Sequence, residues 1–190
     1  LAARFEHLAA AAPDAATRIA DLPVMPPAER RAVLDDWNAT ARAFDADCVH
    51  TLFERQVEAT PDAPALVHEA TTLTYAELDA RANRAAHVLR QMGVAPGTVV
   101  GLATRRSPDL LVGALAILKA GGAYLPLDPT YPADRLALYL EDSGAPVVVT
   151  QSAVEAELPA HGAQTLCLDI DPRLSAAPET APDGGATTDD

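Results

Sequence analysis

The stretch LKAGGAYLPLDPTYPADRL, residues 118–136, constrains the fold more than any other part of the chain. It contains the end of an apolar helix, a Gly-Gly exit, a short strand and a proline that opens a second helix. Proline favours the first turn of a helix, and glycine favours the position just past a helix end. The stretch therefore predicts a helix, a strand and a second helix in succession, which is one unit of an α/β fold.

The same alternation extends from about residue 64 to residue 168. Short apolar or β-branched runs predict strands at 65–67, 71–74, 99–102, 123–127, 146–150 and 165–168. Apolar residues at helical spacing predict helices at about 75–92, 108–118, 132–143 and 152–158. The first two strands are close enough to form a hairpin, and the others are separated by helices. The sequence thus predicts an α/β fold with a mainly parallel sheet and flanking helices.

Several helix ends carry specific signals. Thr74 and Glu77 have the spacing of a capping box, in which each side chain bonds the other residue's backbone amide. Gly93 and Gly144 follow helical patterns and are expected to be left-handed caps. The helix at 110–118 is apolar nearly all round, so we expect it to be covered on most sides.

The pattern divides the chain into three parts. Residues 1–44 contain two expected helices, at about 1–12 and 26–37, followed by a stretch without periodicity. Residues 45–170 open with a helix at 50–59 and contain the α/β pattern. Residues 171–190 are rich in Pro, Ala, Thr, Gly and Asp without any period, which predicts a disordered polar tail or a truncated loop.

Composition excludes some functions. The net charge of −13 argues against a nucleic-acid partner, because phosphates require clustered Lys and Arg. The longest apolar run is far shorter than the roughly 20 residues needed to cross a bilayer, so we expect no membrane contact. Cys48 and Cys167 show no pairing pattern, which favours a reducing compartment. We therefore expect a cytoplasmic protein.

The Gly-Gly pair could be mistaken for a phosphate cradle. A cradle places glycines between a strand and the start of a helix, whereas Gly121 and Gly122 follow a helix at its negative end. We interpret them as a helix exit. Lys119 lies in the last turn of that helix, where a cation complements the terminal carbonyls, and we favour this capping role over a catalytic one. Tyr124 is expected to pack, with a substrate contact as the alternative.

The remaining candidates form no catalytic constellation. Asp128 follows a strand at the edge where open α/β sheets bind ligands, although Asp-Pro is also an ordinary turn. For Glu77 we favour the role of a helix cap over that of a general acid. The histidines do not have the spacing of metal ligands; they are His7, His50, His68, His87 and His161. No serine lies in the G-x-S-x-G sequence of a nucleophile elbow; the serines are Ser107, Ser143, Ser152 and Ser175. We therefore assign no catalytic, cofactor-binding or metal residue.

Four strings together resemble the adenylation region of nonribosomal peptide synthetases. PPAERRAVLDDWNAT, residues 26–40, is similar to the segment joining a condensation domain to an adenylation domain. HTLFERQVEATPDAPALV, residues 50–67, is similar to the opening of that adenylation domain. LTYAELDARANRAAHVLR, residues 73–90, resembles its first core motif, and residues 118–136 resemble its second. The likeness covers about residues 22–150, in the family's order.

The resemblance implies a large modular enzyme. Its adenylation domain would use ATP and Mg²⁺ to convert an amino acid to an aminoacyl adenylate, then load it on a phosphopantetheine carrier domain. Residues 1–44 would be the end of a condensation domain and its linker, and 45–170 the incomplete N-terminal part of the adenylation domain. The phosphate loop, substrate pocket and lid would follow Asp190, so we expect this chain to be inactive alone.

Two other interpretations stay open. A fragment of an acyl- or aryl-CoA ligase of the same superfamily would share the fold, although the segment 37–40 and the wording of residues 118–128 favour the peptide synthetase. A non-enzymatic scaffold module is the other interpretation. Against it, the sheet looks incomplete and the apolar helix needs a partner face. A small flavodoxin-like binding protein would need a phosphate-binding loop that the sequence lacks.

Overall fold

The computed structural model describes residues 2–11, 18, 22, 24–43 and 47–188, and its contacts divide the chain into two units, 1–45 and 46–190. The first unit contains α1 (Ala2–Ala11) and α2 (Pro27–Arg31), and α2 continues into a π-helical segment, η2 (Ala32–Asp36). Pro27 occupies the first turn of α2, as the sequence predicts. The predicted boundary between residues 44 and 45 lies outside the described residues.

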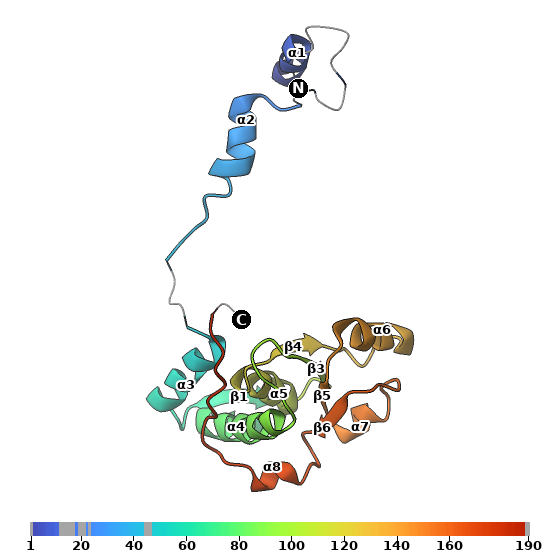
Figure 1. Cartoon of the computed structure of the whole chain (residues 1–190). Coiled ribbons are helices and arrows are strands. Elements are labelled where there is room, and N and C mark those ends of the chain that lie inside the picture. The colour runs from blue at the N-terminus through green and yellow to red at the C-terminus, as the bar shows by residue number, and fades with distance from the viewer. Residues whose placement is uncertain (1, 12–17, 19–21, 23, 44–46, 189–190) are drawn as a thin grey trace. The chain divides into compact units, whose positions relative to one another are not determined.

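The second unit contains a four-stranded parallel sheet (Figure 1). Its order is β4-β3-β5-β6, and every neighbouring pair runs parallel. The strands are β3 (Val99–Ala103), β4 (Ala123–Pro126), β5 (Val147–Thr150) and β6 (Gln164–Cys167). The predicted α/β fold with a mainly parallel sheet is therefore confirmed.

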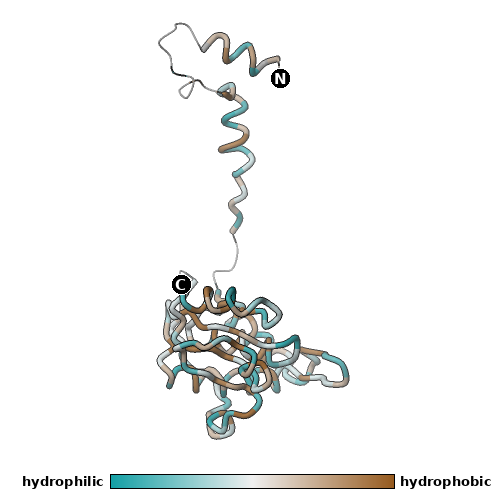
Figure 2. Tube along the Cα trace, turned by 90° about the vertical axis from the view of Figure 1, so that its right-hand side faces the viewer, coloured by the Kyte–Doolittle hydropathy of each residue, from teal (hydrophilic) through white to brown (hydrophobic). Residues whose placement is uncertain are grey.

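Helices cover both faces of this sheet. Side chains alternate along a strand, so Val147 and Val149 of β5 join the core beneath α4 (Tyr75–Gln91) and α5 (Pro108–Lys119). Val148 faces the opposite core, with residues of α6 (Ala133–Ser143) and α7 (Ser152–Glu155). Both layers are visible in Figure 1, and Figure 2 shows the hydrophobic stretches of chain that build them. Burial on two faces explains why β5 is a continuous apolar run.

A β-hairpin and the helix α3 (Val49–Ala59) pack against α4 and α5. β1 (Pro64–His68) pairs antiparallel with β2 (Thr71–Thr74), as expected. Leu66 and Leu73 from the hairpin pack with Leu78 of α4 and Val112 of α5 in a third, smaller core. Phe53 of α3 packs against it as well.

The predicted helix ends are confirmed. Thr74 accepts a hydrogen bond from the Glu77 amide at 3.2 Å, and the Glu77 carboxylate accepts one from the Thr74 amide at 2.9 Å. Gly93 and Gly144 have φ angles of 94° and 59°, in the left-handed region that glycine adopts without strain.

The apolar helix α5 is less enclosed than its sequence predicts. Its inner side packs on the sheet and on α4, but Leu111 keeps 46% of its surface exposed. A single exposed leucine is ordinary in a folded protein, so it identifies no binding site by itself.

The C-terminal segment is more ordered than the first of its two expected forms, a disordered tail or a truncated loop. Residues 171–188 form α8 (Arg173–Ala176) and then return along α4 (Figure 1). The contacts that hold this return are made largely by backbone carbonyls, which leave no period in the sequence. No helix in the described parts of the chain is long and apolar enough to span a membrane.

Replacing Ile117 by Ala should test the core between α5 and the sheet. Ile117 is fully buried there, and deleting a buried branched side chain costs about 2–5 kcal/mol of unfolding free energy. Leu111→Ala, on the exposed side of the same helix, should cost no more than about 0.5 kcal/mol. Urea denaturation followed by circular dichroism gives both values, and equal losses would contradict this placement of α5.

Candidate functional site

The carboxyl ends of β3 and β5 form the position at which open α/β sheets usually bind ligands. From β3 the chain moves to β4 on one side, whereas from β5 it moves to β6 on the other, so the order reverses between β3 and β5. Residues Thr104 and Gln151 directly follow these two strands. This topological switch point is the first candidate site.

Gln151 makes hydrogen bonds across the switch point. Its side-chain carbonyl oxygen accepts a hydrogen bond from the Arg105 backbone amide at 3.1 Å. Its side-chain amide nitrogen donates to Asp109 at 2.6 Å and to the Ser107 hydroxyl at 3.2 Å. Gln151 thereby ties the end of β5 to the start of α5 and to the residues that follow β3.

A cleft of about 550 Å³ lies beside the switch point, next to β3 and β4. Its polar lining comes from Thr104, Arg105, Arg106, Asp128 and Thr130. Thr104 is buried, and its hydroxyl has no hydrogen-bond partner within the described structure. Apolar residues complete the lining, and the guanidinium of Arg105 is paired at 2.6 Å with Glu157, which is not among the lining residues.

Asp128 lies at this cleft, as its position after a strand predicts, but its chemistry is that of a turn. Its carboxylate accepts hydrogen bonds from the Thr130 amide at 2.9 Å and the Thr130 hydroxyl at 2.8 Å. These two bonds, with a smaller contribution from the charge of Arg106, lower the pKa of Asp128. A carboxylate held in its charged form is a poor general acid at neutral pH.

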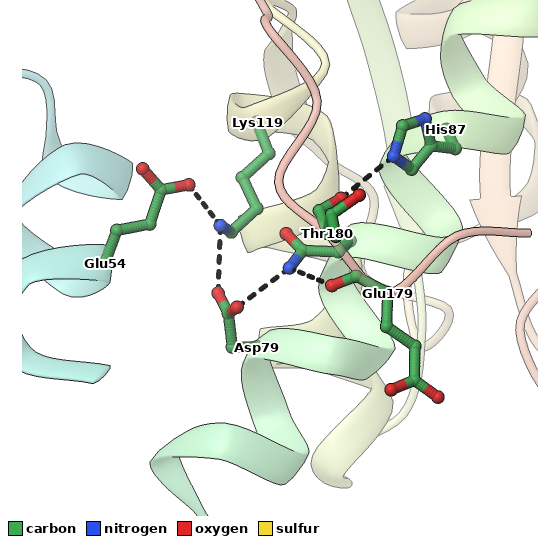
Figure 3. A network of polar contacts seen from close by, with 7 residues as sticks. Glu54, Asp79, His87, Lys119, Glu179 and Thr180 are labelled. Carbon is green, nitrogen blue, oxygen red and sulfur yellow. Dashed lines mark hydrogen bonds and ion pairs between the residues drawn. The ribbon is translucent and has the colours of Figure 1, made fainter. Parts of the chain in front are cut away.

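Lys119 has a role that the sequence did not predict. Its side chain is completely buried, and its ammonium forms ion pairs with Glu54 of α3 and, at 2.9 Å, with Asp79 of α4 (Figure 3). Lys119 does lie in the last turn of α5, as expected, but its ammonium is bonded by two carboxylates that the sequence analysis did not identify. The glycines that follow it close the helix end. Gly121 donates to the Leu118 carbonyl and Gly122 to the Ile117 carbonyl. The same two bonds support the helix-exit interpretation of the glycines.

The polar network continues from Asp79 toward the C-terminal segment. Asn83, fully buried on α4, donates to Asp79 at 2.8 Å and to the backbone carbonyl of Glu179 at 2.6 Å. One turn further along α4, the His87 ring lies 2.9 Å from the Thr180 carbonyl oxygen. Figure 3 shows this series of contacts crossing from α3 to the returning segment.

The histidines do not assemble a metal site. No group of three or more potential His, Cys, Asp or Glu ligands occurs among the described residues. His50 is half-buried at the start of α3, and its pKa is lowered. Burial is the main cause, the charge of Lys119 adds to it, and the charge of Glu54 opposes it. Ring nitrogens of His7 and His161 are buried without hydrogen-bond partners within the described structure.

The serines and cysteines likewise show no nucleophile. Ser107 and Ser152 bond Gln151 and Asp169, while Ser143 and Ser175 donate to the backbone carbonyls of Leu140 and Pro172. Burial and the neighbouring Glu155 raise the pKa of Cys167 to about 12, which keeps its thiol protonated and unreactive. Both cysteines are free, in agreement with their lack of a pairing pattern.

Comparison with known proteins places this architecture in a family. The AMP-binding enzyme family matches residues 53–189, which is more than half of the chain. The chain therefore belongs to the AMP-binding enzyme family, and it represents an N-terminal part of the AMP-binding domain.

Its relatives are peptide synthases. A linear gramicidin synthase of Brevibacillus parabrevis is 50% identical over 155 residues, which are 81% of this chain and 3% of the relative. Chondramide synthase cmdD of Chondromyces crocatus is 46% identical over 187 residues, which are 96% of this chain and 5% of the relative. The chain thus spans only a few per cent of the length of these relatives.

Solved structures agree with this assignment. The nonribosomal peptide synthetase FmoA3, in its AMPPNP-bound form, matches with a TM-score of 0.73 and 36% identity over 84% of this chain and 17% of that chain. The N-terminal subdomain of NpsA from Klebsiella oxytoca matches with a TM-score of 0.64 over 73% of this chain and 35% of that one. At 22% identity, NpsA shows the fold alone. The resemblance to peptide synthetase adenylation domains is confirmed.

Replacing Lys119 by Met should strongly destabilise the second unit. The change leaves Glu54 and Asp79 without their shared cation, and breaking a buried ion pair in this way costs about 3–5 kcal/mol. As a control, Glu157→Gln breaks the exposed pair between Arg105 and Glu157, for at most about 1 kcal/mol. Urea denaturation of both variants measures these losses. Equal, small losses would show that the Lys119 network does not stabilise the unit.

The burial of His50 predicts a loss of stability in mild acid. Its folded-state pKa lies below the ordinary value of 6.5, so the unfolded chain binds the proton more tightly. The contribution of His50 to stability is therefore complete above that value and is lost as the pH falls through the folded pKa. His50→Gln should lose less unfolding free energy than the wild type between about pH 7.5 and pH 5. Parallel pH dependences of the two proteins would exclude this effect.

Proposed function

We propose that this chain forms the first part of an amino-acid-activating adenylation domain in a nonribosomal peptide synthetase. The observation that carries the proposal is the match of residues 53–189 to the AMP-binding enzyme family together with 50% identity to a linear gramicidin synthase. In this proposal the carboxylate of an amino acid attacks the α-phosphate of ATP in the complete domain, which forms an aminoacyl adenylate and releases pyrophosphate. The aminoacyl group then passes to the thiol of a carrier, and AMP leaves.

The reaction requires ATP, and the AMPPNP-bound form of FmoA3 supports ATP as the ligand of the complete domain. Mg²⁺ would neutralise the phosphate charges, and phosphopantetheine on a separate carrier domain would accept the aminoacyl group. Residues 1–44 would belong to the end of a condensation domain and its linker, 45–170 to the N-terminal part of the adenylation domain, and 171–190 to a truncated loop of it. We place the whole protein in the cytoplasm.

The residues that the structure describes would contribute architecture to that reaction. Adenylation requires groups that hold a carboxylate in line with the α-phosphate and stabilise the departing pyrophosphate. Within the described residues, Lys119 is buried in ion pairs, Asp128 is bonded to Thr130, and Gln151 makes hydrogen bonds across the switch point. We therefore infer that the catalytic groups lie outside these residues, and that the sheet and its helices support them.

The test is ATP–pyrophosphate exchange, measured on two forms of the protein. The 190-residue chain alone should give no amino-acid-dependent exchange. The protein as it is encoded, with any flanking sequence in place, should exchange label in the presence of one or a few of the common amino acids. Exchange by the isolated chain itself would show that the active site has been misplaced.

The alternatives give different results in the same assay. An acyl- or aryl-CoA ligase would respond to fatty or aromatic acids instead, and would release a CoA thioester when CoA is added. A non-enzymatic scaffold would give no ATP–pyrophosphate exchange with any amino acid, fatty acid or aromatic acid. Either of these results, obtained with correctly folded protein, would overturn the proposed amino-acid activation.

A further inference from the structure

Two segments far apart in sequence meet at the C-terminal end of α5. One is α3 (Val49–Ala59), which directly follows the stretch that leads into the second unit. The other comprises residues 177–188, which we call the strap, and it runs from α8 back across α4 (Figure 1). The entering and the leaving segments of the unit are thus attached at one place.

A continuous series of polar contacts links α3 to the strap (Figure 3). It begins with the ion pair between Glu54 of α3 and the buried ammonium of Lys119, and continues through the ion pair to Asp79. Asn83 then donates one amide hydrogen to Asp79 and the other to the Glu179 carbonyl of the strap. We call these five residues the relay.

Backbone packing forms a second attachment at the same place. A Cβ built on Gly184 of the strap would lie 2.4 Å from the Lys119 carbonyl oxygen, closer than any real contact. A Cβ on Gly121 would lie 2.6 Å from the Gly184 carbonyl oxygen. The strap therefore reaches the end of α5 only because both positions are glycine. Next to it, the Cys48 thiol, just before α3, lies 3.9 Å from the Ala186 carbonyl oxygen.

The apolar contacts of both segments are made by partly buried residues. Phe53 of α3 packs against the third core and Ala177 of the strap against the main one, but no residue of α3 is fully buried and every described residue of the strap is exposed or half-buried. Lys119 and Asn83, in contrast, are among the most buried residues of the protein. The relay is therefore the most deeply buried set of contacts that links the two segments.

We propose that the relay makes α3 and the strap one cooperative unit, so that displacing either segment loosens the other. The physical reason is the buried ammonium of Lys119, whose desolvation is offset only while its carboxylate partners are in place. When α3 withdraws Glu54, Asp79 alone must balance the charge and is drawn away from Asn83. Asn83 is then less able to hold the strap. The same steps run in reverse when the strap leaves.

This coupling would connect the first helix of the second unit, α3, with the last described segment of that unit, the strap. The inference concerns the folded chain alone, so it holds or fails independently of amino-acid activation.

The coupling can be tested by hydrogen–deuterium exchange with mass spectrometry on the protein as it is encoded. Gly184→Ala introduces a methyl group against the Lys119 carbonyl and should lift the strap. We expect amide exchange to rise about fivefold or more both in residues 178–186 and in α3. Gly162→Ala is the matched control, since a Cβ there meets nothing within 4 Å, and it should change neither segment.

The reciprocal variant is Glu54→Gln, which keeps the shape of the side chain and removes its charge. It should raise exchange in α3 and in the strap, while the sheet strands keep their wild-type protection. It also keeps the test decisive if Gly184→Ala prevents folding. A rise confined to the strap in Gly184→Ala, or to α3 in Glu54→Gln, would show that the segments are independent and would overturn the proposal.

Discussion

The ammonium group of Lys119 is enclosed on all sides, and the positions of three helices follow from the need to balance its charge. A buried cation is tolerated only when carboxylates reach it with good geometry. Glu54 of α3 and Asp79 of α4 supply them at the end of α5. The helix α3, which has no fully buried residue, is attached to the unit by this ion pair together with the packing of Phe53.

The elements that were predictable from sequence are those set by neighbouring residues. The Thr74–Glu77 box and the left-handed Gly93 are local signals: the box begins α4 and Gly93 ends it, both where expected. The run at 146–150 predicted a strand, and its apolar character follows from the cover on both sides of β5, by α4 and α5 on one side and by α6 on the other. Alternation of such elements was enough to give the parallel sheet and its class.

The features that sequence did not predict depend on distant partners or on the backbone. The local rule for cations at helix ends suggested that Lys119 caps α5, but its partner Glu54 is 65 residues away. The strap has no period, so the sequence indicated only a disordered tail or a truncated loop and did not predict what holds it. It is held by contacts such as Asn83 to the Glu179 carbonyl, and a carbonyl oxygen is present at every residue. Gln151 was missed for a similar reason, since its three partners meet it only in the folded sheet.

The pair Gly121–Gly122 explains how a recognisable motif can determine architecture without chemistry. Their amides close α5, so they are not available to a phosphate. A Cβ on Gly122 would lie 3.0 Å from the Thr98 carbonyl oxygen, and one on Gly121 would collide with the strap. Glycine is thus required at both positions by the approach of other backbone segments. The most family-specific stretch of this chain therefore determines where helices, strand and strap meet, and the reacting groups of an adenylating enzyme have to be supplied by other residues.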